Sequence, residues 1–146
     1  MSGIGAAVVA AALVATVAVG WWLRRRDGAL RTAGTEEDAV TAAAFRRLGV
    51  RPADADLTVV QFSTAFCGPC RATKARLRQL QVGRPGLAVV QVDAESHLDE
   101  VRALDVRRTP TLFYLGPDGK LIGRSSGAPR PDELTALVDA HVGGPA

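Results

Sequence analysis

The sequence predicts an α/β fold in which helices flank a mixed central β-sheet, preceded by one N-terminal transmembrane helix. An uncharged apolar stretch runs from Gly3 to Leu23. After it, β-branched runs alternate with segments of helical composition, which is typical of parallel β-α-β units. A Gly-Pro-Asp-Gly turn at 116–119 separates the last two predicted strands and adds an antiparallel hairpin to the sheet.

The charge of the chain is distributed unevenly along its 146 residues. The net charge of +3 lies within the first 31 residues, where four arginines outnumber one aspartate, and the remaining acidic and basic residues cancel. A nucleic-acid-binding protein would spread basic residues over its folded domain. We therefore expect no nucleic-acid partner. We also expect one ordinary domain and a monomer.

The first segment, residues 1–26, is predicted to be a membrane anchor with a basic flank. As a helix, Gly3–Leu23 is about 31 Å long, which matches the roughly 30 Å hydrocarbon core of a bilayer. Trp21 and Trp22 end the apolar stretch, and Arg24–Arg26 follow it. Aromatic rings and arginines at this position favour the membrane–water interface.

The orientation of this anchor follows from its arginines, which all lie after the apolar stretch. The positive-inside rule then predicts a single-pass membrane protein whose C-terminal domain is cytoplasmic. An extracytoplasmic domain is the alternative. A cleavable signal peptide is another alternative, because Ala18-Val19-Gly20 offers a small-x-small site, but no basic residue precedes the apolar stretch.

The rest of the chain divides into a linker or edge strand at 27–34 and one domain at 35–146. Thr35 is predicted to cap a helix that places Val40, Ala44 and Leu48 on one face and ends at Gly49. Asp132 is predicted to cap the last helix. The other predicted elements are strands at 57–63, 87–92, 111–115 and 120–124 and helices at 71–80 and 97–104. The strand at 87–92 is so apolar that we expect it to be buried on both faces.

The chain has two cysteines, Cys67 and Cys70, three positions apart. A structural disulfide framework needs more pairs, and a closed zinc site needs four ligands, so we expect redox chemistry and no metal. At the start of a helix, backbone N–H groups would stabilise the Cys67 thiolate. Cys70, one turn later, could attack the mixed disulfide. Gly68 leaves the approach open, and Pro69 suits the first helical turn.

Residues 59–77, VVQFSTAFCGPCRATKARL, resemble the active-site region of thioredoxins. Residues 106–112, VRRTPTL, resemble the thioredoxin segment that contains a cis-proline facing the active site. Gly119-Lys120 and Gly127 match the family's hairpin and the glycine before its last helix. The resemblance covers roughly residues 57–142, extends back toward Thr35, and implies a thioredoxin-like fold.

The resemblance also implies roles for individual residues. Cys67 would be the nucleophile and Cys70 the resolving thiol. Pro110 would be the cis-proline, and the backbone of Thr109 would contact a substrate chain. The expected activity is protein-disulfide reduction with an electron-donor reductase as partner and no organic cofactor.

Three positions depart from the family pattern. Phe66 stands where thioredoxins usually have a tryptophan, and Gln61 and Gln91 appear at the positions of a buried acid and a lysine. A glutamine cannot titrate, so proton transfer would come from solvent or a partner. In the simpler interpretation the two amides hydrogen-bond to each other on adjacent strands. The departures also keep open a redox-inactive, membrane-tethered binding module.

Overall fold

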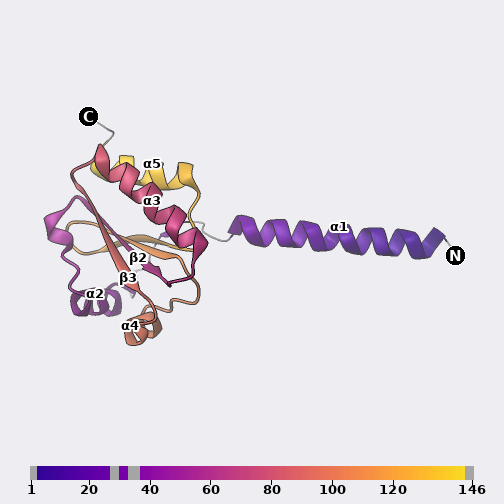
Figure 1. Cartoon of the computed structure of the whole chain (residues 1–146), viewed down its shortest axis with the longest axis horizontal. Helices are drawn as coiled ribbons and strands as arrows, with labels where there is room; N and C mark the ends of the chain where they lie inside the picture. Colours follow the sequence, from indigo (N-terminus) through magenta and orange to yellow (C-terminus); the bar gives the residue numbers. More distant parts are fainter. Residues whose placement is uncertain (1–2, 27–29, 33–36, 144–146) are drawn as a thin grey trace.

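The computed structural model describes residues 3–26, 30–32 and 37–143, and the side chains of residues 5, 7–23 and 39–143. The described elements follow in the order α1 (Gly3–Arg26), β1 (Leu30–Thr32), α2 (Glu37–Arg47), a short 3-10 turn (Pro52–Asp54), β2 (Leu57–Ser63), α3 (Gly68–Val82), β3 (Leu87–Asp93), α4 (Leu98–Ala103), β4 (Thr111–Leu115), β5 (Leu121–Ser126) and α5 (Pro131–Val142). Figure 1 shows a sheet with α3 and α5 on one face and α2 and α4 on the other.

In the described part of the chain, the sheet has five strands in the order β1-β5-β4-β2-β3. β2 and β3 are parallel, and the other neighbouring pairs are antiparallel. The prediction of a mixed sheet flanked by helices is therefore confirmed. β1 is the edge strand expected within 27–34, and the rest of that segment lies outside the described residues.

Two hydrophobic clusters lie on the two faces of the sheet. β4 contributes to both because its side chains alternate, with Phe113 packing under α2 and Tyr114 packing under α3 and α5. On the first face, the Phe113 ring packs edge-on against Phe45 and Phe62. On the second face, Leu77 of α3 and Leu134 of α5 are fully buried.

The strand β3 corrects one prediction. It lies at the edge of the sheet, and only Leu87 and Val92 are buried, while residues 88–91 are half-buried. Burial on both faces belongs instead to β2, whose residues 57–62 are all buried between two neighbouring strands. An apolar sequence indicates a buried environment but carries no information on strand order.

The helices α2 and α5 correct two smaller predictions. Val40 is 55% exposed, whereas Thr41, Ala44 and Phe45 are buried, so the core-facing side of α2 is rotated from the predicted one. Gly49 does follow the end of α2 with φ of +71°, a conformation that favours glycine. The predicted Thr35 cap lies outside the described residues. The N-cap of α5 is Arg130, which places Asp132 in the first turn instead.

The helix α1 confirms that the N-terminal segment is helical. Its described side chains are all exposed. Among the residues whose side chains are described, no helix is both long enough and apolar enough to cross a membrane. The structure thus supports a helix here without supporting the predicted transmembrane span.

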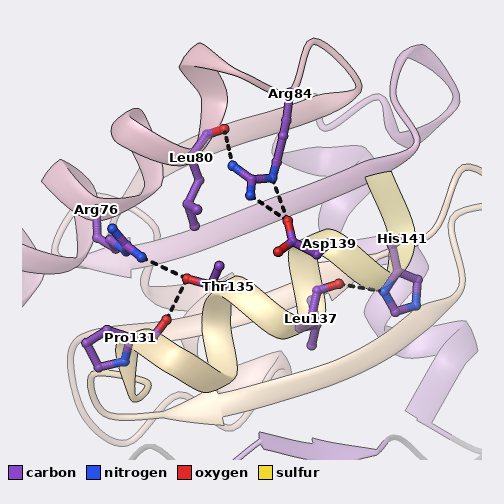
Figure 2. Close-up of polar contacts among 8 residues, drawn as sticks. All are labelled: Arg76, Leu80, Arg84, Pro131, Thr135, Leu137, Asp139 and His141. Carbon is purple, nitrogen blue, oxygen red and sulfur yellow. Dashed lines mark hydrogen bonds and ion pairs between the residues drawn. The ribbon is translucent and has the colours of Figure 1, made fainter. Parts of the chain in front are cut away.

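Polar contacts hold α3 against α5 (Figure 2). Arg84, two residues after the end of α3, donates from Nε to Asp139 Oδ1 at 2.7 Å and from Nη1 to the Leu80 carbonyl at 3.3 Å. Arg76 donates from Nη2 to the Thr135 hydroxyl at 2.9 Å. These contacts fix the position of α3, whose first turn carries the cysteine pair.

Candidate active site

One end of the sheet gathers the chemically active residues, and we call it the redox edge. β2 and β3 both finish there, with Ser63 paired to Asp93. β4 begins there, with Thr111 paired to Phe62. The loop from β2 leads to Cys67, and the Thr109–Pro110 bond directly precedes β4. The redox edge is thus defined by Ser63, Cys67, Asp93 and Pro110.

Cys67 and Cys70 form a disulfide, with 5.2 Å between their Cα atoms. Cys67 is the N-cap of α3, and Pro69 lies in the first turn as expected. The backbone N–H of Cys70 donates to Cys67 Sγ at 3.2 Å. A hydrogen bond of this kind, at the positive end of a helix, favours a thiolate once the disulfide is reduced. A Cβ added at Gly68 would meet no atom within 4 Å, so the approach over that residue is open.

The peptide bond between Thr109 and Pro110 is cis, as the resemblance implied. The hydroxyls of Thr109 and Thr64 lie 3.5 Å apart, which connects this bond to the loop that leads to Cys67. On its other side, the Pro110 carbonyl accepts a hydrogen bond from Gly127 N at 2.7 Å. Loops from three parts of the chain therefore meet at the redox edge.

Gln61 and Gln91 form a hydrogen-bond chain behind the disulfide. They are neighbours in register on β2 and β3. Gln91 Nε2 donates to Gln61 Oε1 at 3.2 Å, and Gln61 Nε2 donates to the Cys70 carbonyl at 3.0 Å. Gln61 is completely buried. The two amides are hydrogen-bonded to each other, as the simpler interpretation held, and neither can exchange a proton with a thiol.

A groove of about 430 Å³ lies beside the disulfide. Its walls come from the ends of β2 and β3 and from the first turns of α3, and its lining includes Ser63, Thr64, Cys67, Arg71, Lys74 and Asp93. Ser96 Oγ and the Glu95 N–H donate to the Asp93 carboxylate, and these bonds lower the pKa of Asp93. The groove therefore presents two cations, Arg71 and Lys74, and the Asp93 carboxylate beside the disulfide.

Phe66 differs from the other three phenylalanines, which are buried, because it is 97% exposed. It stands directly before Cys67, so an apolar ring is exposed to solvent next to the disulfide in the sequence. Sequence reasoning did not identify Ser63, Thr64 or Asp93 as residues of the site. Asp93 had a recognisable signal, because an aspartate in a turn typically accepts a hydrogen bond from the backbone N–H two residues later, here that of Glu95. Thr64 had none, because its partner Thr109 is 45 residues away.

A metal ion has no evident place in the described part of the chain, where no three His, Cys, Asp or Glu side chains are grouped closely enough to share one.

Comparisons with known proteins agree with this geometry. The family model for thioredoxin matches residues 39–140. Thioredoxin H4-1 of Oryza sativa is 29% identical over 90 residues, covering 60% of this chain and 68% of its own. Thioredoxin of Chlamydia trachomatis is 32% identical over 85 residues, covering 58% and 82% respectively.

Among solved structures, oxidised mitochondrial thioredoxin 3 of Saccharomyces cerevisiae is similar, with a TM-score of 0.55 and 30% identity over 67% of this chain and 88% of that one. The matching family model covers well over half of the sequence and includes both cysteines. The chain belongs to the thioredoxin family and is a thiol–disulfide oxidoreductase with a disulfide between Cys67 and Cys70.

Proposed function

We propose that this protein reduces disulfides of other proteins through a dithiol–disulfide cycle of Cys67 and Cys70, close to a membrane. The observation that supports this most directly is the position of Cys67. It caps α3, receives the Cys70 N–H at 3.2 Å, and lies on the same edge of the sheet as the cis Thr109–Pro110 bond. This arrangement supplies a stabilised thiolate and an edge for a substrate chain.

The proposed reaction begins with the reduced protein. The Cys67 thiolate attacks one sulfur of the substrate disulfide, the substrate S–S bond breaks, and the departing sulfur takes a proton from water. Cys70 then loses its proton and attacks Cys67 Sγ, which releases the second substrate thiol. The substrate gains two electrons, and the protein is left with the Cys67–Cys70 disulfide.

The proton of Cys70 has no acceptor in the hydrogen-bond chain of Gln61 and Gln91. Solvent or the substrate would take it instead. A second dithiol, supplied by an electron-donor reductase, returns the protein to its reduced form, and no organic cofactor or metal is needed for either step. The groove beside Cys67 gives solvent a route to the disulfide.

The membrane part of the proposal rests on α1. Residues 3–23 are uncharged, the described side chains of α1 are exposed, and Arg24–Arg26 follow at its end. If this helix enters a bilayer, the positive-inside rule would keep the arginines in the cytoplasm and place the redox domain there. An extracytoplasmic domain that handles disulfides in the cell envelope is the second candidate. Labelling Cys67 from one side of sealed membranes distinguishes the two.

The reducing direction is tested by insulin reduction and by the redox potential. We expect the purified protein to reduce insulin with dithiothreitol as donor. Because Gly68 and Pro69 separate the cysteines as in thioredoxin, we expect a potential near the roughly −270 mV of thioredoxin. A value around −120 mV, typical of a strong oxidant, would contradict the reductase direction. If insulin is not reduced, the redox-inactive binding module replaces this proposal.

A further inference from the structure

The strand β1 determines where the N-terminal helix joins the domain. β1 runs antiparallel to β5, with Leu30 opposite Ser125 and Thr32 opposite Gly123. Leu30 therefore lies at the end of β5 that leads to Gly127, whose N–H bonds to the Pro110 carbonyl. The chain enters the sheet at the redox edge and runs away from it. Figure 1 agrees, because α1 leaves the domain on the side where α3 begins.

The connection between α1 and this edge is short. Only residues 27–29 separate Arg26 from Leu30, and four extended residue steps reach at most about 14 Å. Along the redox edge, β1 and β2 are three strand positions apart, which is on the order of 15 Å. A membrane at the end of α1 would therefore lie close to the redox edge.

The opposite end of the domain lies farther from the anchor. Val142, at the end of α5, packs beside Gly86, which directly precedes β3. β3 and its neighbour β2 each span seven residues, so this far end is about 20 Å from the redox edge. An anchor attached to the C-terminal end of α5 would thus hold the redox edge away from the membrane.

The redox edge also carries an exposed apolar group. Phe66 is 97% exposed beside Cys67, and Arg71 is an exposed cation one turn along α3. Aromatic rings and arginines suit the membrane–water interface, where an apolar body and a polar surface meet. Phe66 and Arg71, at the redox edge next to α1, therefore favour a partner that lies at the bilayer surface.

We propose that the redox edge faces the membrane, and that the substrates of this protein are disulfides of membrane proteins located within a few residues of the bilayer surface. This inference rests on the proposed membrane anchor and on disulfide reduction. It adds the orientation of the domain and the class of substrate. Electrons pass from Cys67 and Cys70 to the membrane-proximal disulfide by the exchange steps given above.

The experiment moves the anchor while leaving the domain unchanged. The full chain is reconstituted in phosphatidylcholine–phosphatidylglycerol vesicles and compared with a variant in which residues 1–29 follow Gly143 instead of preceding Leu30. The probe is a disulfide-containing peptide attached to a phospholipid headgroup through either a short or a long spacer. The rate of insulin reduction, with insulin added outside the vesicles, measures the number of active outward-facing domains. Each rate of peptide reduction is divided by this insulin rate. Dithiothreitol is the donor throughout.

We expect the natural chain to reduce the short-spacer peptide at least about tenfold faster than the rearranged chain, because the anchor raises the effective concentration of the redox edge at the surface. The difference should shrink with the long spacer. Equal rates with the short spacer would overturn the inference while leaving disulfide reduction intact. If the natural chain does not float with vesicles, both the anchor and the inference are wrong, and insulin reduction still tests the redox function separately.

Discussion

The side-chain amide of Gln61 donates a hydrogen bond to the backbone carbonyl of Cys70, with 3.0 Å between Nε2 and the oxygen. Gln91 completes the chain by donating to Gln61 Oε1. Gln61 therefore holds the first turn of α3 against β2 while contributing no titratable group. Two neutral amides therefore lie behind the disulfide, and in the proposed mechanism the proton of Cys70 leaves to solvent or substrate.

The substitution Gln61→Glu should introduce the missing proton acceptor. Burial raises the pKa of a carboxyl at this position, and once ionised it could take the proton of Cys70. We expect the second exchange step to become roughly tenfold faster or more, with an additional ionisation in the pH profile of insulin reduction. Stopped-flow measurement of mixed-disulfide release between pH 5 and 9 checks this result.

Gln61→Leu is the matched control, because it removes the hydrogen bond to Cys70 without adding an acid. It should lower stability by about 1–3 kcal/mol, since a buried carbonyl loses its partner, and should add no ionisation to the pH profile. If Gln61→Glu and Gln61→Leu give the same profile, position 61 does not control the proton of Cys70.

Phe66→Ser should separate substrate contact from folding. Because the ring is 97% exposed, the free energy of unfolding should change by less than about 0.5 kcal/mol. The KM for insulin should rise several-fold, whereas the rate with a small aromatic disulfide should stay nearly constant. Chemical denaturation and steady-state kinetics provide the measurements. An unchanged KM would show that Phe66 does not contact protein substrates.

The ion pair between Arg84 and Asp139 should matter for stability and not for the redox reaction. Arg84 is 8% exposed, so Asp139→Ala would leave a nearly buried guanidinium with only the Leu80 carbonyl. We expect a loss of about 2–4 kcal/mol in urea unfolding. The rate of insulin reduction per folded molecule should not change, because the pair lies at the far end of α3 from Cys67.

The exposed pair of Arg102 and Asp99 is the control for this prediction. Their side chains are 74% and 88% exposed, and Arg102→Ala should cost less than about 0.5 kcal/mol. A loss for Asp139→Ala as small as that for Arg102→Ala would contradict the role assigned to the buried pair.

Tyr114 should make the fold sensitive to alkaline pH. Its hydroxyl lies 3.0 Å from Ser125 Oγ, and burial raises the pKa of Tyr114 well above its usual range. The folded state therefore keeps the phenol neutral. The stabilisation from the buried neutral phenol is complete below a pH of about 10, where the phenol of the unfolded chain titrates. It is lost as the pH rises further. Tyr114→Phe should cost about 1 kcal/mol at pH 7.

The same variant should lose less stability than the natural chain between pH 9 and pH 11, because it has no phenol at position 114 to ionise. Urea unfolding at pH 7, 9 and 11 compares the two proteins. Parallel pH dependences would mean that Tyr114 does not contribute to alkaline unfolding.

The sequence predicted the bounds of a strand well where residues that are rare in strands flank a β-branched or aromatic run. β2 and β4 begin and end at the predicted residues, because their β-branched and aromatic runs are bounded by Asp56, Pro110 and Gly116. The parallel pairing of β2 with β3 was also predicted, but the edge position of β3 and the pairing of β1 with β5 were not. Strand order depends on contacts between distant segments, and a run of apolar residues fits a central or an edge strand.

The site was predictable to a similar extent. The Cys-Gly-Pro-Cys and Thr-Pro motifs identified the disulfide and the cis bond, because each needs particular residue types at fixed spacing. The bond from Gln61 to Cys70 was not foreseen, since it joins a side chain on β2 to a backbone group on α3. The exposure of Phe66 was also unforeseen, because an aromatic residue beside a strand more often packs into a core.

The central claim is that Cys67 attacks substrate disulfides and Cys70 resolves the product. Mixing the reduced Cys70→Ser variant with insulin, and analysing intact mass without reductant, tests it most directly. We predict a stable mixed disulfide through Cys67 in most of the protein, and little such product for Cys67→Ser. Failure of both variants to form a mixed disulfide, with no insulin reduction by the natural chain, would contradict the claim.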